Sequence, residues 1–225
     1  MAKLHRDQFG KLPYVLKKPT VTSGGMPTII FLHGSGTRGT DLEALELNPF
    51  FGRNSCINNP KFQYMVFAPL CSRNSWFDVF EQLQEFVKMV ASYPEVDHER
   101  ISLVGTSMGG FAAWQLAMTM PTYFSSLVPI CGGGMSWNVS RIIHIPTWAF
   151  HGADDTKVPV EAGIDMINKL KLRGGNARIT VLERTGHNVW DYAYANEELF
   201  EWMRGQKKQP FVCEKSECNG SAFYG

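Results

Sequence analysis

The sequence lacks any long run of charge of one sign. Its 22 basic and 21 acidic residues are spread along 225 residues and leave a formal net charge of +1. Proteins that bind nucleic acid or a strongly acidic partner usually carry a clustered basic patch. We therefore expect neither kind of partner.

Long apolar runs are also missing. No stretch approaches the roughly 20 apolar residues that span a bilayer, and the first residues, "MAKLHRDQFGKLPYVLKKP", have no apolar core followed by a small-residue cleavage site. We expect a protein with no membrane span, located in the cytoplasm. The sequence does not decide its oligomeric state.

Cysteine is sparse and shows no metal-binding or disulfide pattern. We expect free thiols, and the one pair close enough in a polar segment to suggest a bridge is Cys213 and Cys218. The other cysteines are Cys56, Cys71 and Cys131. The neighbouring Asp154 and Asp155 have no further carboxylate or histidine at ligand spacing, so we expect no metal site there.

What the sequence does have is a regular alternation of apolar strand-like runs and helical patterns. A chain of this length, with 44% hydrophobic residues, forms one domain by default. Strong strand patterns lie at 28–34, 62–70, 100–105, 125–133, 146–152 and 177–187, and 12–19 adds a candidate edge strand. Helical patterns lie at 79–90, 108–118, 160–173 and 199–203.

This alternation is typical of an α/β fold with a mostly parallel sheet of about six to seven strands, flanked by helices. We place a single domain at residues 1–205 and a polar tail, expected to be mobile, at 206–225. The connection between the runs 125–133 and 146–152 is short, so we expect no large lid over the site.

The segment "RISLVGTSMGGFAAW" places Ser107 in G-T-S-M-G between a strand pattern and a helix pattern. This is the setting of a nucleophile elbow, in which a serine stands on a sharp turn at the end of a strand. Glycines leave room for the crowded backbone there. A bare G-x-S-x-G is common by chance, but between a strand and a helix it favours a catalytic serine over a structural turn.

A nucleophilic serine needs a base and an orienting carboxylate, which follow it in the order acid, then histidine. Asp154 and Asp155 follow the run "PTWAF", and His187 follows "ITVLE". The other five histidines fit less well: His5 and His98 lie in polar segments, His144 precedes a strand, and His33 and His151 suit structural roles at strand ends. Two backbone N–H groups, of Ser35 in "HGSGTRG" and of Met108 after the serine, could form the oxyanion hole.

At these motifs the chain resembles the α/β-hydrolases, in particular the compact carboxylesterases, phospholipases and acyl-protein thioesterases. The resemblance spans about residues 28–203 and is carried by "FLHGSG", "NSWFDVF", "GTSMGG", "HGADDTKVP" and "TGH". It implies a triad of Ser107, Asp155 and His187, with Ser35 and Met108 at the oxyanion hole. The segment "TGHNVWDYAY" is closer to esterase and predicted-peptidase relatives. Dienelactone hydrolases are similar in build but use cysteine at the elbow, so serine argues against their chemistry.

The resemblance implies a serine esterase acting on small to medium acyl esters, or thioesters, through an acyl-enzyme. We expect this mechanism to need no metal and no organic cofactor. Two alternatives stay open: a peptidase or amidase using the same triad, and a non-catalytic protein that binds a ligand on this fold. Trp76, Trp137 and Trp190 follow strands and are candidates for lining the substrate pocket, whereas Trp148 lies within a strand and is expected in the core.

Overall fold

The computed structural model describes residues 4–19 and 24–211. Its centre is an eight-stranded sheet with the strand order β1-β2-β4-β3-β5-β6-β7-β8. The six strands from β3 to β8 run parallel, while β2 pairs antiparallel with both β1 and β4. This arrangement confirms the expected α/β-hydrolase fold with its mostly parallel sheet.

From β3 onward the strands and helices alternate along the chain as the sequence predicts, but it did not predict the short helices α1 and α5. The strands are β1 (Leu4–Phe9), β2 (Leu12–Lys17), β3 (Met26–Leu32), β4 (Met65–Pro69), β5 (Val96–Thr106), β6 (Ser126–Ile130), β7 (Thr147–Gly152) and β8 (Ala177–Leu182). The α-helices are α1 (Leu42–Glu46), α2 (Phe80–Ala91), α3 (Met108–Thr119), α4 (Val160–Leu172), α5 (Trp190–Ala195) and α6 (Glu197–Gly205). Short 3-10 helices are η1 (Ser35–Thr37), η2 (Pro49–Phe51), η3 (Cys56–Asn58), η4 (Trp76–Val79) and η5 (Ser136–Ile142).

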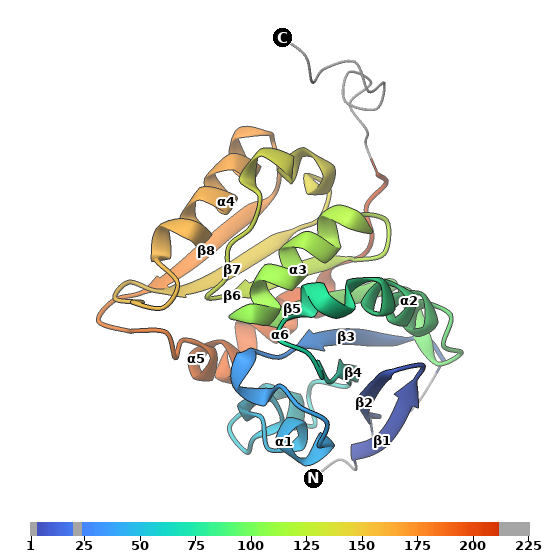
Figure 1. The fold of residues 1–225 in the computed structure, drawn as a ribbon. Coiled ribbons are helices and arrows are strands. Elements are labelled where there is room, and N and C mark those ends of the chain that lie inside the picture. Colours follow the sequence, from blue (N-terminus) through green and yellow to red (C-terminus); the bar gives the residue numbers. More distant parts are fainter. Residues whose placement is uncertain (1–3, 20–23, 212–225) are drawn as a thin grey trace.

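Helices cover both faces of the sheet (Figure 1). The apolar faces of α2, α3 and α4 form one buried cluster with one side of the strands, and α1, α5, α6 and the helices η2 and η3 form a second cluster on the other side. Each strand in the middle of the sheet is therefore buried on both faces. That burial explains the continuous apolar runs in the sequence.

The N-terminal edge of the sheet differs from the expectation. The segment 12–19 was expected as the edge strand, but β2 lies between β1 and β4, and β1 is the edge. The burial of β1 shows why its sequence gave no signal: the strand LHRDQF has no buried residue and alternates too little to be distinguished from a polar leader. This extra strand raises the count to eight.

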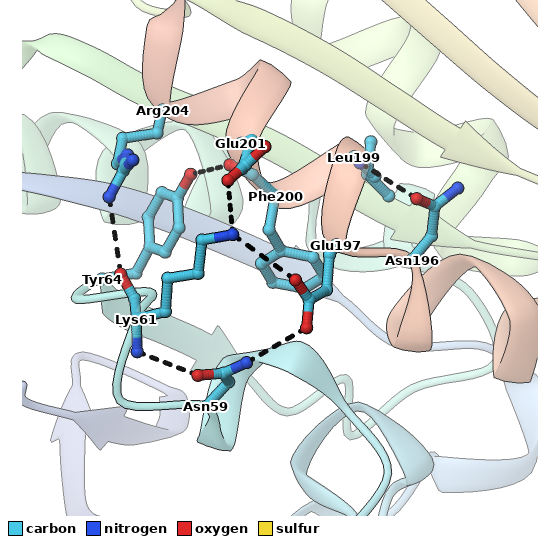
Figure 2. A network of polar contacts seen from close by, with 9 residues as sticks. All are labelled: Asn59, Lys61, Tyr64, Asn196, Glu197, Leu199, Phe200, Glu201 and Arg204. Atoms are coloured by element: carbon cyan, nitrogen blue, oxygen red, sulfur yellow. Dashed lines mark hydrogen bonds and ion pairs between the residues drawn. The ribbon is translucent and has the colours of Figure 1, made fainter.

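A network of polar contacts holds α6 against the chain that leads into β4 (Figure 2). Lys61 forms ion pairs with Glu201 at 2.6 Å and with Glu197 at 3.5 Å. Beneath them the buried hydroxyl of Tyr64 donates a hydrogen bond of 2.5 Å to the carbonyl of Phe200. The network fixes α6 on the same face of the sheet as α5, which contributes to the site described below.

Residues 206–211 leave α6 and run along the amino ends of the parallel strands. The N–H of Lys208 donates to the carbonyl of Glu99 at 2.9 Å, and the ring of Phe211 meets His144 edge-on at 5.3 Å. Cys213 and Cys218 lie outside the described residues. Within the described ranges, Cys56, Cys71 and Cys131 are buried free thiols, and no helix is long and apolar enough to cross a membrane.

Candidate active site

Ser107 stands on a strained turn between β5 and α3. Its backbone has φ 53° and ψ −116°, an unfavourable combination for a residue with a side chain. The glycines of the motif make the turn possible. A Cβ atom on Gly105 would lie 2.1 Å from the carbonyl of Gly109, and one on Gly109 would lie 2.0 Å from the carbonyl of Leu32. The G-x-S-x-G spacing is therefore a steric requirement of this turn.

The turn brings three distant residues together at the carboxyl edge of the sheet. The Oγ of Ser107 lies 2.8 Å from Nε2 of His187, and Nδ1 of His187 lies 2.7 Å from Oδ2 of Asp155. The hydrogen bond to the carboxylate assigns the proton to Nδ1, which leaves Nε2 as the acceptor for the serine hydroxyl. This is the geometry that general-base activation of a serine requires.

Asp155 is fixed on both of its oxygens. Its Oδ2 accepts from His187, while Oδ1 accepts the N–H groups of Lys157 at 2.9 Å and Val158 at 3.0 Å. Burial acts to raise the pKa of this carboxyl, but the hydrogen bonds from Val158, His187 and Lys157 outweigh it and lower the pKa. Asp155 is therefore a carboxylate in the folded protein at neutral pH.

The backbone N–H groups of this turn bind Asp155 rather than the neighbouring Asp154. The side chain of Asp154 is exposed, and its backbone N–H donates to the carbonyl of Thr185. A second buried histidine, His151, binds the carbonyl of Val158 at 2.9 Å and lies 3.4 Å from Oδ2 of Asp155. His151 is thus part of the support of the acidic residue, in agreement with its expected structural role.

The loop after β3 packs directly on the serine turn. A Cβ atom on Gly34 would lie 3.3 Å from the carbonyl of Thr106, so the backbone approaches closely here. Ser35 begins η1 and Met108 begins α3. The N–H of a first helical residue has no acceptor within its own helix. Of the two residues expected to supply oxyanion N–H groups, Ser35 lies in the loop that packs on the serine turn, and Met108 follows Ser107 within that turn.

His33 and Trp76 hold this loop in place. Nδ1 of His33 donates to the carbonyl of Gly34 at 2.7 Å, and Nε2 accepts the N–H of Cys71 at 3.0 Å. The indole N–H of Trp76 donates to the carbonyl of His33 at 3.0 Å. Burial lowers the pKa of His33 to about 4, so the ring is neutral and can accept the bond from Cys71.

A cavity of about 440 Å³ opens beside Ser107 and His187. Its remaining walls are formed by residues 34–37, by Asn48 and Pro49, by Thr106, by Lys157 and Val158, and by Trp190 and Tyr194. Sequence reasoning missed most of these residues because they come from separate segments with no shared motif. The larger cavities at Phe9 and at Arg38 lack the serine and the histidine.

The three tryptophans expected at the pocket have different positions. Trp190 lines the cavity and its ring meets His187 edge-on at 5.6 Å. Trp76 does not line it, because the side chain is fully buried beneath the loop after β3. Trp137 lies on η5 and is 71% exposed, away from the cavity walls. Trp148 is buried in β7, as expected.

Among the residues that the structure describes, no group of three or more His, Cys, Asp or Glu side chains is placed to hold a metal ion. The connection between β6 and β7 forms only the short helix η5, with no large lid.

The site is assembled from loops at the carboxyl ends of β3, β5, β7 and β8, and from α5. In open α/β sheets, ligands bind at this edge.

A parallel sheet with this strand order and a serine turn after β5 defines an α/β-hydrolase. Residues 49–198, more than half of the chain, match the dienelactone hydrolase family. The chain belongs to that family, with serine at the elbow position where cysteine was expected for dienelactone hydrolases. No curated protein sequence is significantly similar to it.

Solved structures show the same fold. A thermostable esterase is 29% identical with a TM-score of 0.74, and the match covers 92% of this chain and 63% of that esterase, so this chain spans less than two thirds of its length. A putative dienelactone hydrolase from Klebsiella pneumoniae subsp. pneumoniae is 18% identical, with a TM-score of 0.64 over 91% of this chain and 95% of that one. An acylaminoacyl peptidase from Pyrococcus horikoshii is 15% identical, with a TM-score of 0.60 over 97% of this chain and 44% of that one.

Proposed function

We propose that this protein is a serine hydrolase that cleaves carboxylic esters, or thioesters, of small to medium acyl groups. The observation that carries the proposal is the chain of two short hydrogen bonds from Ser107 through His187 to the buried carboxylate of Asp155. Family membership and esterase neighbours support a hydrolase.

In the proposed reaction, His187 takes the proton of Ser107 as the hydroxyl oxygen attacks the ester carbonyl. Asp155 holds the imidazole in the required tautomer and stabilises its positive charge. The N–H groups of Ser35 and Met108 bind the oxyanion of the tetrahedral intermediate. His187 then protonates the leaving alcohol, and water repeats the sequence on the acyl-enzyme. Neither a metal nor a cofactor takes part in this mechanism.

The neighbouring thiol does not compete with the serine. Cys131 lies directly after β6 and is fully buried, and burial raises the pKa of its thiol to about 12. A nucleophilic cysteine requires an accessible thiolate. This contrast favours Ser107 as the nucleophile.

Labelling with a fluorophosphonate tests the nucleophile. The label is expected on Ser107 and is expected to disappear, with ester hydrolysis, in Ser107→Ala, because that change removes only one exposed oxygen. Retained esterase activity together with a label on another serine contradicts the proposal. Met108→Pro removes one oxyanion donor and is expected to lower kcat by roughly 10²–10³, provided that circular dichroism shows a native spectrum.

A peptidase or amidase activity on the same triad is the second candidate, because acylaminoacyl peptidases share the fold. The relative turnover of an aryl ester and the matching aryl amide separates the two. We expect the ratio of ester to amide turnover to exceed the ratio of their rates of uncatalysed hydrolysis. A preference for the amide, after the same correction, favours the peptidase.

A further inference from the structure

Two hydroxyl groups meet at the wall of the cavity next to the serine. The Oγ1 of Thr106, the last residue of β5, lies 2.5 Å from the phenol oxygen of Tyr194 on α5. Both side chains line the cavity, although Thr106 is only 5% exposed and Tyr194 only 3%. We refer to Thr106 and Tyr194 as the hydroxyl pair.

The hydroxyl pair has one more proton than its own hydrogen bond uses. Each hydroxyl carries one proton, and the single bond between the two oxygens consumes one of them. In the described ranges of the chain, no other hydrogen bond is formed by either oxygen. Burial raises the pKa of Tyr194, which keeps the phenol protonated. One buried O–H is therefore available to an acceptor inside the cavity.

The adjoining wall also offers donors. The side-chain amide of Asn48 donates to Oγ1 of Thr37 at 3.0 Å, and its carbonyl oxygen accepts the N–H of Phe50 at 3.0 Å. The acceptor of Asn48 is therefore in use, while the hydroxyl proton of Thr37 and one amide proton of Asn48 are not used in these bonds. No carboxylate lines the cavity within the described residues, since Asp155 lies behind His187.

These donors are linked to one another along the wall of the cavity. His187 delivers its proton to the leaving alcohol, so the alcohol lies next to His187. Thr37 belongs to the loop after β3, Asn48 binds Thr37, and the ring of Tyr194 packs edge-on against Phe50 with centroids 5.1 Å apart. We take the acyl group, rather than the alcohol next to His187, to face this wall.

We propose that the preferred substrates are esters whose acyl group carries an oxygen acceptor near the carbonyl, such as an alkoxyacyl or hydroxyacyl group, and that the hydroxyl pair binds this oxygen. The proposal rests on the proposed function, because it concerns the same site. It predicts a preference for an oxygenated acyl chain over an alkyl chain of equal length.

The test compares two pairs of 4-nitrophenyl esters of equal chain length, methoxyacetate with butyrate and 3-methoxypropanoate with pentanoate. The ratio of kcat/KM within each pair is divided by the ratio of the hydroxide-catalysed rate constants, which removes the intrinsic reactivity of the ether-containing ester. For the wild-type protein we expect a corrected preference of about 3- to 10-fold in at least one pair, the range of one neutral hydrogen bond.

Variants assign the preference to the hydroxyl pair. Thr106→Val and Tyr194→Phe each leave one hydroxyl and are expected to keep much of the preference, whereas the double variant is expected to lose it. Tyr64→Phe is the matched control, because it removes another buried phenol hydroxyl remote from the cavity, and we expect it to keep the wild-type ratio. Circular dichroism establishes folding of each variant.

A corrected wild-type ratio near one in both pairs overturns the inference, and this measurement needs no variant. A folded double variant that keeps the wild-type preference also overturns it. If Ser107 is required for hydrolysis of both esters and the corrected ratio is near one, only this inference fails. If neither ester is cleaved in a Ser107-dependent reaction, the proposed function itself fails.

Discussion

Asp154 and Asp155 are adjacent in the sequence, but the two side chains have different surroundings. Asp155 binds His187 and two backbone N–H groups, while Asp154 points to solvent. We expect Asp155→Asn to lower kcat by about 10⁴, because the amide favours the wrong imidazole tautomer. Asp154→Asn is expected to cost far less. Steady-state kinetics on both folded variants measures the two losses in kcat. A larger loss in Asp154→Asn than in Asp155→Asn would place Asp154 in the triad.

The glycines of the serine turn make a second prediction at the scale of single residues. Gly109→Ala places a Cβ atom against the carbonyl of Leu32, which is a backbone atom of a strand paired on both sides. We expect a loss of about 1–3 kcal/mol or more in the free energy of unfolding. Gly36→Ala is the matched control, since a Cβ there meets nothing within 4 Å. Denaturant unfolding of the two variants checks the difference, and equal stabilities would contradict it.

At the scale of an element, the loop after β3 depends on a neutral histidine. Nε2 of His33 accepts the N–H of Cys71. Protonation of Nε2 would place its N–H against the N–H of Cys71 and break this hydrogen bond. With a pKa of about 4 in the folded protein against about 6.5 in the unfolded chain, this histidine stabilises the fold above about pH 6.5. That stability is lost as pH falls from about 6.5 to about 4 and amounts to about 3 kcal/mol.

The pKa of His33 can be measured by NMR titration of its ring nitrogens. We expect Nε2 of His33 to stay unprotonated at pH 5.5. Titration of His33 near pH 6.5 would show that the loop is not held by this bond. Denaturant unfolding at several values of pH between 4 and 7 measures the accompanying loss of stability.

At the scale of the whole molecule, residues 206–211 and the site lie at opposite ends of the parallel strands. Lys208 contacts Glu99 and Phe211 contacts His144, and both partners lie near the amino ends of the parallel strands. Ser107 follows the carboxyl end of β5. We expect truncation after Gly205 to leave the hydrolysis of short esters largely unchanged. Loss of the Lys208 hydrogen bond and of the Phe211 contact is expected to lower stability by about 1–2 kcal/mol.

Ester kinetics and thermal unfolding of the truncated chain test this expectation. A large fall in the rate with no loss of stability would show that residues after 205 act at the site. The size of the cavity leads to a related expectation, that rates do not rise steadily from acetyl to palmitoyl esters. A steady rise along that series would contradict a small acyl site.

The sequence by itself determined the layers of the molecule and the order of its motifs. Buried parallel strands need continuous apolar runs, and the helices that cover them need a periodic apolar face, so both leave a local signal. The turn at Ser107 also leaves a local signal, because the close approach of backbones there excludes a Cβ atom at Gly105 and Gly109. Strand β1 lacked such a signal because none of its residues is buried.

Only the tertiary structure decided how distant segments share one cavity. His187 reaches Ser107 across 80 positions of the chain, and Tyr194 reaches Thr106 across 88. Trp76 and Trp190 both follow strands in the sequence, yet one is buried under a loop and the other lines the cavity. Burial and hydrogen-bond partners are properties of the packed fold rather than of local sequence, so the lining of the cavity and the unused proton of the hydroxyl pair emerge only when the helices are packed on the sheet.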